Sequence, residues 1–183
     1  MDAADAYASR ICRVMARLGL SEAGRFAGVP LCPEASGLVS VGTDVFGREQ
    51  FVTPDVAPRW AALVAAAAAD GVSIGLVSAF RSVDQQVAIF ERKLAAGIPL
   101  ADILTVNAPP GYSEHHTGRA VDVTAPGLEP LTEAFEQAPA FDWLVAHADA
   151  LGLRLSYPRH NPHGFVYEPW HWYFLGPPGS APR

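Results

Sequence analysis

Cysteine is scarce in this 183-residue sequence, which contains only Cys12 and Cys32. Two cysteines can form one bond at most, so a disulfide framework cannot carry the stability of the fold. Cys12 lies within a helical hydrophobic pattern, and we expect it to be a buried thiol. The fold must therefore depend on a hydrophobic core, for which apolar residues supply 50% of the sequence.

Positive charge is also scarce. Lys and Arg number 13 against 19 Asp and Glu, which gives a formal net charge of −6. Such a chain lacks the basic surface with which proteins bind a phosphate backbone, so we expect no nucleic-acid partner. The charged fraction of 17% is below the usual value of about 25%, which is typical of a folded protein and not of a disordered one.

Long apolar runs are absent, since no stretch approaches the roughly 18–20 residues of a membrane helix. The N-terminus carries Asp2 and Asp5 where a secretory signal has basic residues. We therefore expect no membrane insertion and a cytoplasmic location, or a periplasmic or secreted one if a leader has been removed. The sequence gives no sign of an obligate protein partner.

The length predicts one domain over residues 1–183. A hydrophobic pattern of helical period predicts an N-terminal helix at about 3–19 that packs onto the rest of the domain. The segment 177–183 is rich in Pro and Gly, and we expect a loose tail there.

The remaining pattern alternates irregularly between helices and strands. Thr53-Pro54 is an expected helix start, and the sequence from Ser82 to Gln85 forms a capping box. Helices are expected at 54–70, 82–96, 100–106 and 141–151, and strands at 38–41, 73–80, 119–124, 153–157 and 170–175. This order favours an α+β fold with a small antiparallel sheet flanked by helices.

Residues with catalytic chemistry gather in two short segments, 113–122 and 167–172. Together they supply His115 or His116, Asp122, Glu168 and His171. A catalytic zinc site needs three N or O ligands, an open position and often a nearby carboxylate that takes a proton. These segments could supply all of them.

Each of these residues also has a plainer interpretation. Asp122 could form a salt bridge at the end of a strand, and His171 could be a core histidine between two packed tryptophans. Arg81, at the end of a strand, could stabilise an oxyanion or bind a carboxylate, or it could pair with Asp84. We expect that His147, His160 and His163 are not metal ligands.

Taken together, the segments resemble the zinc D-alanyl-D-alanine carboxypeptidases of the VanY and VanXY type, whose fold is shared by the hedgehog signalling domain. Three markers carry the resemblance: Ser-x-His-x-x-Gly-x-Ala-x-Asp at 113–122, Glu-Pro-Trp-His-Trp at 168–172, and Ser-x-Phe-Arg-Ser at 78–82, with Gln86 four residues later. The likeness spans about 43–176, the expected catalytic core. It departs at Ser156 and Tyr173, where the family often has arginine.

The resemblance implies a role for each marker residue. His115, Asp122 and His171 would bind Zn²⁺, and Glu168 would be the catalytic base. Arg81 would polarise the scissile carbonyl or hold the substrate, and Gln86 and Ser113 would position the terminal D-residue.

The implied activity is removal of the C-terminal D-alanine from peptidoglycan stem peptides or their precursors. Both D,D-cleavage of a pentapeptide and L,D-cleavage of a tetrapeptide stay open. Cytoplasmic D,D-cleavage would consume the cell's own precursor, which slightly favours the L,D reaction. The alternatives are a peptidoglycan endopeptidase and a non-enzymatic, zinc-stabilised, hedgehog-like binding module.

Overall fold

A four-stranded antiparallel sheet lies at the centre of the computed structural model, which describes residues 3–20, 29–162 and 164–176. Its strands are β3 (Gly75–Ser78), β4 (Ala120–Thr124), β5 (Leu153–Leu155) and β6 (His171–Phe174), in the order β3-β4-β6-β5. A separate hairpin pairs β1 (Val39–Thr43) with β2 (Glu49–Val52). The sequence-based prediction of an α+β fold with a small antiparallel sheet is confirmed.

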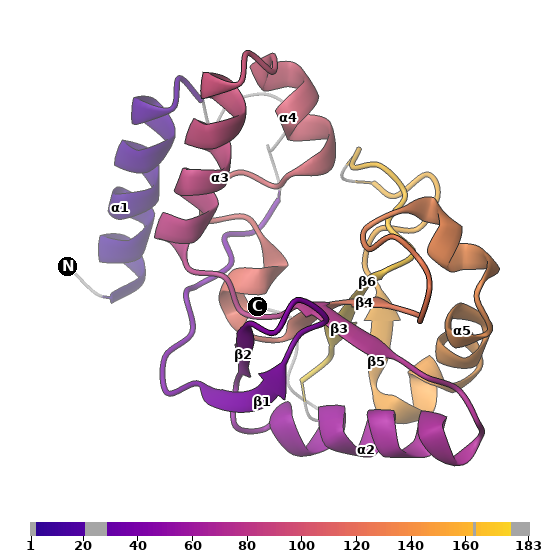
Figure 1. Ribbon diagram of the computed structural model, residues 1–183. Helices are drawn as coiled ribbons and strands as arrows, with labels where there is room; N and C mark the ends of the chain where they lie inside the picture. Colours follow the sequence, from indigo (N-terminus) through magenta and orange to yellow (C-terminus); the bar gives the residue numbers. More distant parts are fainter. Residues whose placement is uncertain (1–2, 21–28, 163, 177–183) are drawn as a thin grey trace.

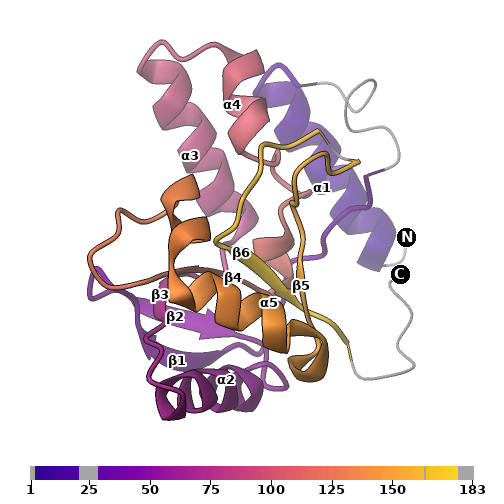
Figure 2. The ribbon, with the colours of Figure 1, turned by 90° about the vertical axis from the view of Figure 1, so that its right-hand side faces the viewer.

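The helices form two groups on different sides of the sheet (Figure 1). They are α1 (Ala3–Arg17), α2 (Ala57–Ala69), α3 (Val83–Ala95), α4 (Leu100–Val106) and α5 (Pro139–Leu151), with short 3₁₀ helices η1 (Glu114–Thr117) and η2 (Glu133–Gln137). Helices α1, α3 and α4 gather together, whereas α2 and α5 cover the sheet, as the turned view in Figure 2 also shows. Helix α1 occupies the segment for which a helix at about 3–19 was predicted.

Two apolar clusters hold these layers together. The larger one joins Trp60 of α2 and Trp143 of α5 to Trp172 of the sheet. The second joins Ile11 of α1 to Phe90 of α3 within one buried cluster. Each fully buried side chain of this size stabilises the fold by about 1.5–3 kcal/mol, so both clusters contribute substantially to holding the helices in place.

The local predictions differ in how well they match the structure. The capping box is confirmed: Ser82 Oγ accepts from the Gln85 amide, and the Gln85 side chain accepts from the Ser82 amide. The expected helix start at Thr53-Pro54 is wrong by three residues, because residues 54–56 form a turn and α2 begins at Ala57. The expected tail at 177–183 lies outside the described residues.

Cys12 was expected to be buried, and this expectation is wrong. The buried stripe of α1 runs through Ile11 and Met15, and Cys12 lies outside it with an exposed side chain. Adjacent positions on a helix are rotated by about 100°, so the neighbour of a buried residue can face solvent. Among the described helices, none has the length and apolar character needed to span a membrane.

Candidate active site

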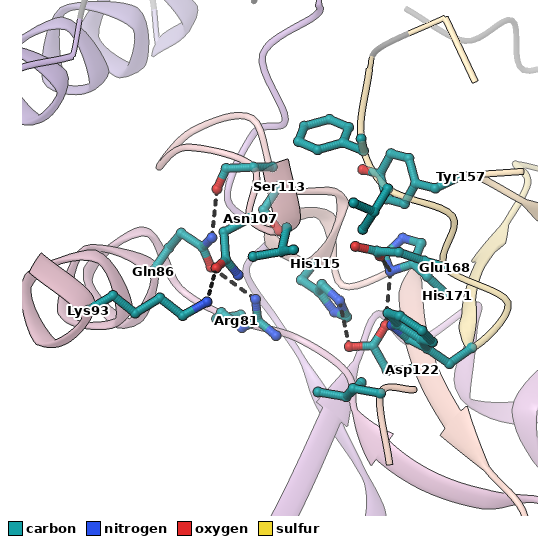
Figure 3. Close-up of a pocket in the computed structure, with 16 residues that line it drawn as sticks. Arg81, Gln86, Lys93, Asn107, Ser113, His115, Asp122, Tyr157, Glu168 and His171 are labelled. Atoms are coloured by element: carbon teal, nitrogen blue, oxygen red, sulfur yellow. Dashed lines mark hydrogen bonds and ion pairs between the residues drawn. The ribbon is translucent and has the colours of Figure 1, made fainter. Parts of the chain in front are cut away.

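A cavity of about 270 Å³ lies beside the ends of β4 and β6 and against helices α3 and α4 (Figure 3). Its wall includes Asp122 from β4 and His171 from β6, which are direct partners in the sheet register. All seven side chains singled out from the sequence line this cavity: Arg81, Gln86, Ser113, His115, Asp122, Glu168 and His171. The sheet and the loops at its edge thus bring residues from three distant segments together.

His115 reaches the cavity because a tight turn returns the chain into β4. It lies on η1, which ends at Gly118 with φ at 64°. A Cβ at this position would lie 2.9 Å from Leu38 Cδ2 and 3.3 Å from the backbone nitrogen of Thr53. Glycine is therefore required both by the left-handed conformation and by the close approach of neighbouring chain.

Three ligand atoms converge at the base of the cavity. His115 Nε2 lies 3.1 Å from Asp122 Oδ2, and His171 Nδ1 lies 2.9 Å from Asp122 Oδ1. Ligand atoms of the three residues all lie within 4.8 Å of one another, and all three side chains are buried. A shared carboxylate between two imidazoles is a donor set that suits a zinc ion.

In each of the two imidazoles, one ring nitrogen faces Asp122 and the other bonds to a different group. The second bond indicates which nitrogen carries the proton. His115 Nδ1 lies 2.6 Å from the carbonyl oxygen of Ala79, which can only accept, so Nδ1 carries the proton. His171 Nε2 lies 3.0 Å from Glu114 Oε2, which places a proton on Nε2 in the same way. In their neutral forms both imidazoles would present lone pairs to the Asp122 carboxylate. A positive charge is needed between these groups: a metal cation would supply one, and without metal the second proton of His171 supplies it.

The close contacts among Asp122, His115 and His171 also shift the pKa values of these three groups. Burial alone would raise the pKa of Asp122, but His115 and His171 lower it well below its usual range. Burial alone would lower the pKa of His171, yet its bonds to Asp122 and Glu114 raise that pKa to about 10. Burial lowers the pKa of His115, which favours its neutral form.

Glu168 lies beside this group on the chain segment before β6. Its Oε2 is 3.9 Å from His171 Nδ1, and its backbone amide donates to the carbonyl of Tyr157. The Tyr157 ring lies 4.8 Å from that of His171, between centroids. Burial raises the pKa of Glu168 to about 7; the charge of His171 opposes this rise and that of Asp122 adds to it.

Arg81 occupies another part of the wall, where polar groups gather away from the two imidazoles (Figure 3). It donates to Gln86 Oε1 at 3.0 Å and to Ser78 Oγ at 3.2 Å. Gln86 in turn donates to the carbonyl of Ala108 at 2.7 Å. The alternative pairing of Arg81 with Asp84 is wrong, because Asp84 instead pairs with Arg10 at 3.0 Å.

Two residues of this wall were missed from the sequence. Lys93 bonds to Asn107, and both line the cavity. Lys93 follows Gln86 by seven residues on α3, which places both on one helix face. That spacing is the signal that could have identified Lys93.

The remaining histidines lie apart from the three convergent groups. His116 is buried; its Nδ1 donates to the carbonyl of Arg81 and its Nε2 accepts from the amide of Gly111. It therefore links the loop before η1 to the segment between β3 and α3. His147 stacks on Trp143 of α5, and His160 is exposed. His163 lies outside the described residues.

Comparison with known proteins identifies the family. The family model for VanY, D-alanyl-D-alanine carboxypeptidase, matches residues 49–177. A D-alanyl-D-alanine carboxypeptidase of Enterococcus faecium is 31% identical over 134 residues, which cover 72% of this chain and 40% of the relative. The bifunctional D-Ala-D-Ala dipeptidase and carboxypeptidase VanXYC of Enterococcus gallinarum is 32% identical over 138 residues, with 73% and 72% covered.

Solved structures show the same fold. The LdcB LD-carboxypeptidase superposes with a TM-score of 0.68 at 30% identity, covering 78% of this chain and 70% of its own. A D,D-pentapeptidase VanY in complex with Zn(II) gives a TM-score of 0.63 at 27% identity, covering 80% and 83%. The chain spans 48% and 40% of the first two curated relatives, so their full lengths extend well beyond the shared region. The match over residues 49–177 places the chain in the VanY family of D-alanyl-D-alanine carboxypeptidases.

Proposed function

We propose that this protein is a zinc-dependent carboxypeptidase that removes the C-terminal D-alanine from peptidoglycan stem peptides. The observation that carries the proposal is the convergence of His115, Asp122 and His171 in a cavity that Glu168 and Arg81 also line. A purely structural metal site needs neither a neighbouring buried carboxylate nor a guanidinium. The arrangement therefore favours an enzyme over a zinc-stabilised binding module.

The donor set fits zinc through two imidazole nitrogens and one carboxylate oxygen, with the cavity leaving room for a further position. A bound zinc ion would act as a Lewis acid on the scissile carbonyl and lower the pKa of a water molecule toward about 7. The bonds from His115 to Ala79 and from His171 to Glu114 hold both rings with a nitrogen directed at this position.

Glu168 is the proposed general base. Its Oε2 lies 3.9 Å from His171 Nδ1, on the cavity side of the proposed ligands, so it can take a proton from the attacking water. The same oxygen can then return that proton to the leaving amine. Burial keeps bulk water from competing for this transfer.

The polar wall around Arg81 is the proposed binding region for the end of the substrate. The guanidinium can share the charge that develops on the carbonyl oxygen or bind the terminal carboxylate. Gln86 holds Arg81 from one side at 3.0 Å, and Ser113 lines the same cavity. Because no acyl-enzyme is required, Ser113 is assigned to binding and not to nucleophilic attack.

The test is hydrolysis of synthetic tri-, tetra- and pentapeptide stems, followed by mass measurement of the products. We expect release of a single D-alanine, from the pentapeptide for a D,D-enzyme or from the tetrapeptide for an L,D-enzyme. Stems that end in L-alanine are the matched control and should not be cleaved. Cleavage of cross-linked wall without release of terminal alanine would favour an endopeptidase. Zinc binding without any cleavage would favour the binding module, and both results would overturn the proposal.

A further inference from the structure

Glu114 is a largely buried acid that is neither a proposed metal ligand nor a proposed proton-transfer group. Its Oε2 lies 3.0 Å from His171 Nε2, and its side chain is 14% exposed. A carboxylate accepts hydrogen bonds, so this contact places a proton on Nε2 and leaves Nδ1, which faces Asp122, as the nitrogen that can bind a metal. We propose that Glu114 is a positioning residue that sets the orientation and the proton position of His171 for metal binding; this inference rests on the proposed function.

The carboxylate of Glu114 is itself fixed by one donor on each oxygen. Ser156 Oγ donates to Oε2 at 2.5 Å, and Arg154 donates to Oε1 at 2.6 Å. Charge-assisted bonds of this kind are stronger than neutral ones. With both oxygens engaged, the plane of the carboxylate cannot rotate away from His171 without breaking one of these bonds.

Arg154 is held in turn by the neighbouring strand. It is the direct partner of Tyr173 in the β5–β6 register, and its guanidinium carbon lies 4.8 Å from the centre of the Tyr173 ring. Ser156 and Tyr173 are two positions at which the sequence departs from the family pattern. In this structure both support the same carboxylate, Ser156 directly and Tyr173 through Arg154.

The geometry makes Glu114 a partner of His171 and not a further ligand of the same ion. Nδ1 and Nε2 lie on different edges of the imidazole, and Asp122 occupies the Nδ1 side at 2.9 Å. Glu114 lies on the Nε2 side. A carboxylate at this position raises the basicity of the metal-binding nitrogen and fixes the ring, which typically contributes 10–100-fold to metal affinity.

The test is the zinc affinity of the purified protein, measured by competition with a chromogenic chelator. Glu114→Gln keeps the size of the side chain and removes its charge, and we expect zinc affinity to fall about 10–100-fold. Arg154→Gln should lower the affinity by a smaller factor. The matched control is Glu136→Gln, because Glu136 also accepts from an arginine, Arg159 at 2.6 Å, and from a hydroxyl, that of Tyr167 at 3.0 Å, but contacts no histidine in the described structure. Its zinc affinity should equal that of wild type.

Two further measurements separate positioning from a purely structural role. If Arg154 acts through Glu114, the double variant should bind zinc no more weakly than Glu114→Gln alone. Co²⁺ bound in place of zinc should show a changed visible spectrum in Glu114→Gln and an unchanged one in Glu136→Gln, because that spectrum reports the ligands.

The outcomes distinguish this inference from the proposed function. Wild type that binds no zinc or cleaves no stem peptide would refute the proposed function. Wild type that does both, together with a Glu114→Gln variant of equal zinc affinity, would overturn the role of Glu114 alone. If Glu114→Gln does not fold, the Arg154→Gln variant provides the test, because the Arg154 side chain is 48% exposed and we expect its replacement to leave the fold intact. Wild-type zinc affinity in that variant would overturn the inference.

Discussion

Replacement of Asp44 with alanine should destabilise the fold through a chain of hydrogen bonds that ends at His115. The Asp44 side chain is 0% exposed. Its oxygens accept from the amides of Phe46 and Arg48 at 2.8 and 2.9 Å, and from the side chains of Arg48 and Gln50 at 2.7 and 2.9 Å. The Asp44→Ala variant loses all four acceptor contacts.

Gln50 connects Asp44 to the candidate active site by hydrogen bonds. Gln50 Oε1 accepts from the Ala79 amide at 2.9 Å, and the Ala79 carbonyl accepts from His115 Nδ1 at 2.6 Å. The Arg48 side chain is 61% exposed, so water can replace its bond. The three remaining donors are the amides of Phe46 and Arg48 and the Gln50 side chain, and at about 1 kcal/mol each their loss amounts to about 3 kcal/mol. For a chain of this size that lowers the thermal midpoint by about 6–12 °C.

Lowering the pH should reduce the difference in free energy of unfolding between wild type and Asp44→Ala. Burial alone would raise the pKa of Asp44, but the bonds from Arg48 and Phe46 lower it overall. Because the folded pKa lies below the unfolded value of about 3.9, the carboxylate stabilises the fold above that value. This contribution is lost as pH falls through the folded pKa.

Thermal unfolding followed by circular dichroism at pH 7 and at a series of pH values below about 3.9 would measure both effects. The control is Asp149→Asn, an exposed acid on α5, which should change stability by less than about 0.5 kcal/mol. An Asp44→Ala midpoint close to that of wild type at pH 7 would refute the reasoning. So would a difference that does not shrink in acid.

Three further predictions concern the site and its supports. Glu168→Ala should keep zinc and lose about 10²–10⁴-fold in kcat, and substantial residual turnover would refute its role as the base. Ser113→Ala should weaken substrate binding or rate yet leave hydrolysis measurable, whereas complete loss in a folded, zinc-loaded variant would reopen nucleophilic catalysis. Gly111→Ala, at φ 89° with its new Cβ 2.6 Å from Ile11 Cγ2, should destabilise the fold by about 2–4 kcal/mol in a denaturant titration. Unchanged stability there would show that α1 is not fixed against this loop.

Elements with strong local signals could be predicted from the sequence. The capping box at Ser82 located α3, and the apolar spacing from Leu100 located α4 with its observed bounds. Strand β2 was missed because its four residues are flanked by turns and its burial depends on pairing with β1. The start of α2 was misplaced because a Thr-Pro pair fits a turn as well as a cap.

Some residues of the candidate site could be predicted from the sequence, and others could not. Its chemical groups could be identified because rare residue types recur at spacings that resemble a family. Glu114 could not be identified as a site residue, because its partner Arg154 lies on β5 and its partner Ser156 lies just after that strand, 40 and 42 residues away in sequence. The sequence predicted neither helix nor strand at η1, whose closing residue Gly118 lies close to Leu38 and Thr53, far away in sequence.

Zinc K-edge X-ray absorption of the zinc-loaded protein tests the central claim most directly. We expect one zinc per chain with nitrogen and oxygen ligands at about 2.0–2.2 Å, including multiple scattering from two imidazoles. His171→Ala should remove one of these imidazoles from the spectrum. Sulfur ligands at about 2.3 Å, or a zinc environment that is the same in His171→Ala, would contradict the assignment of His115, Asp122 and His171 as zinc ligands.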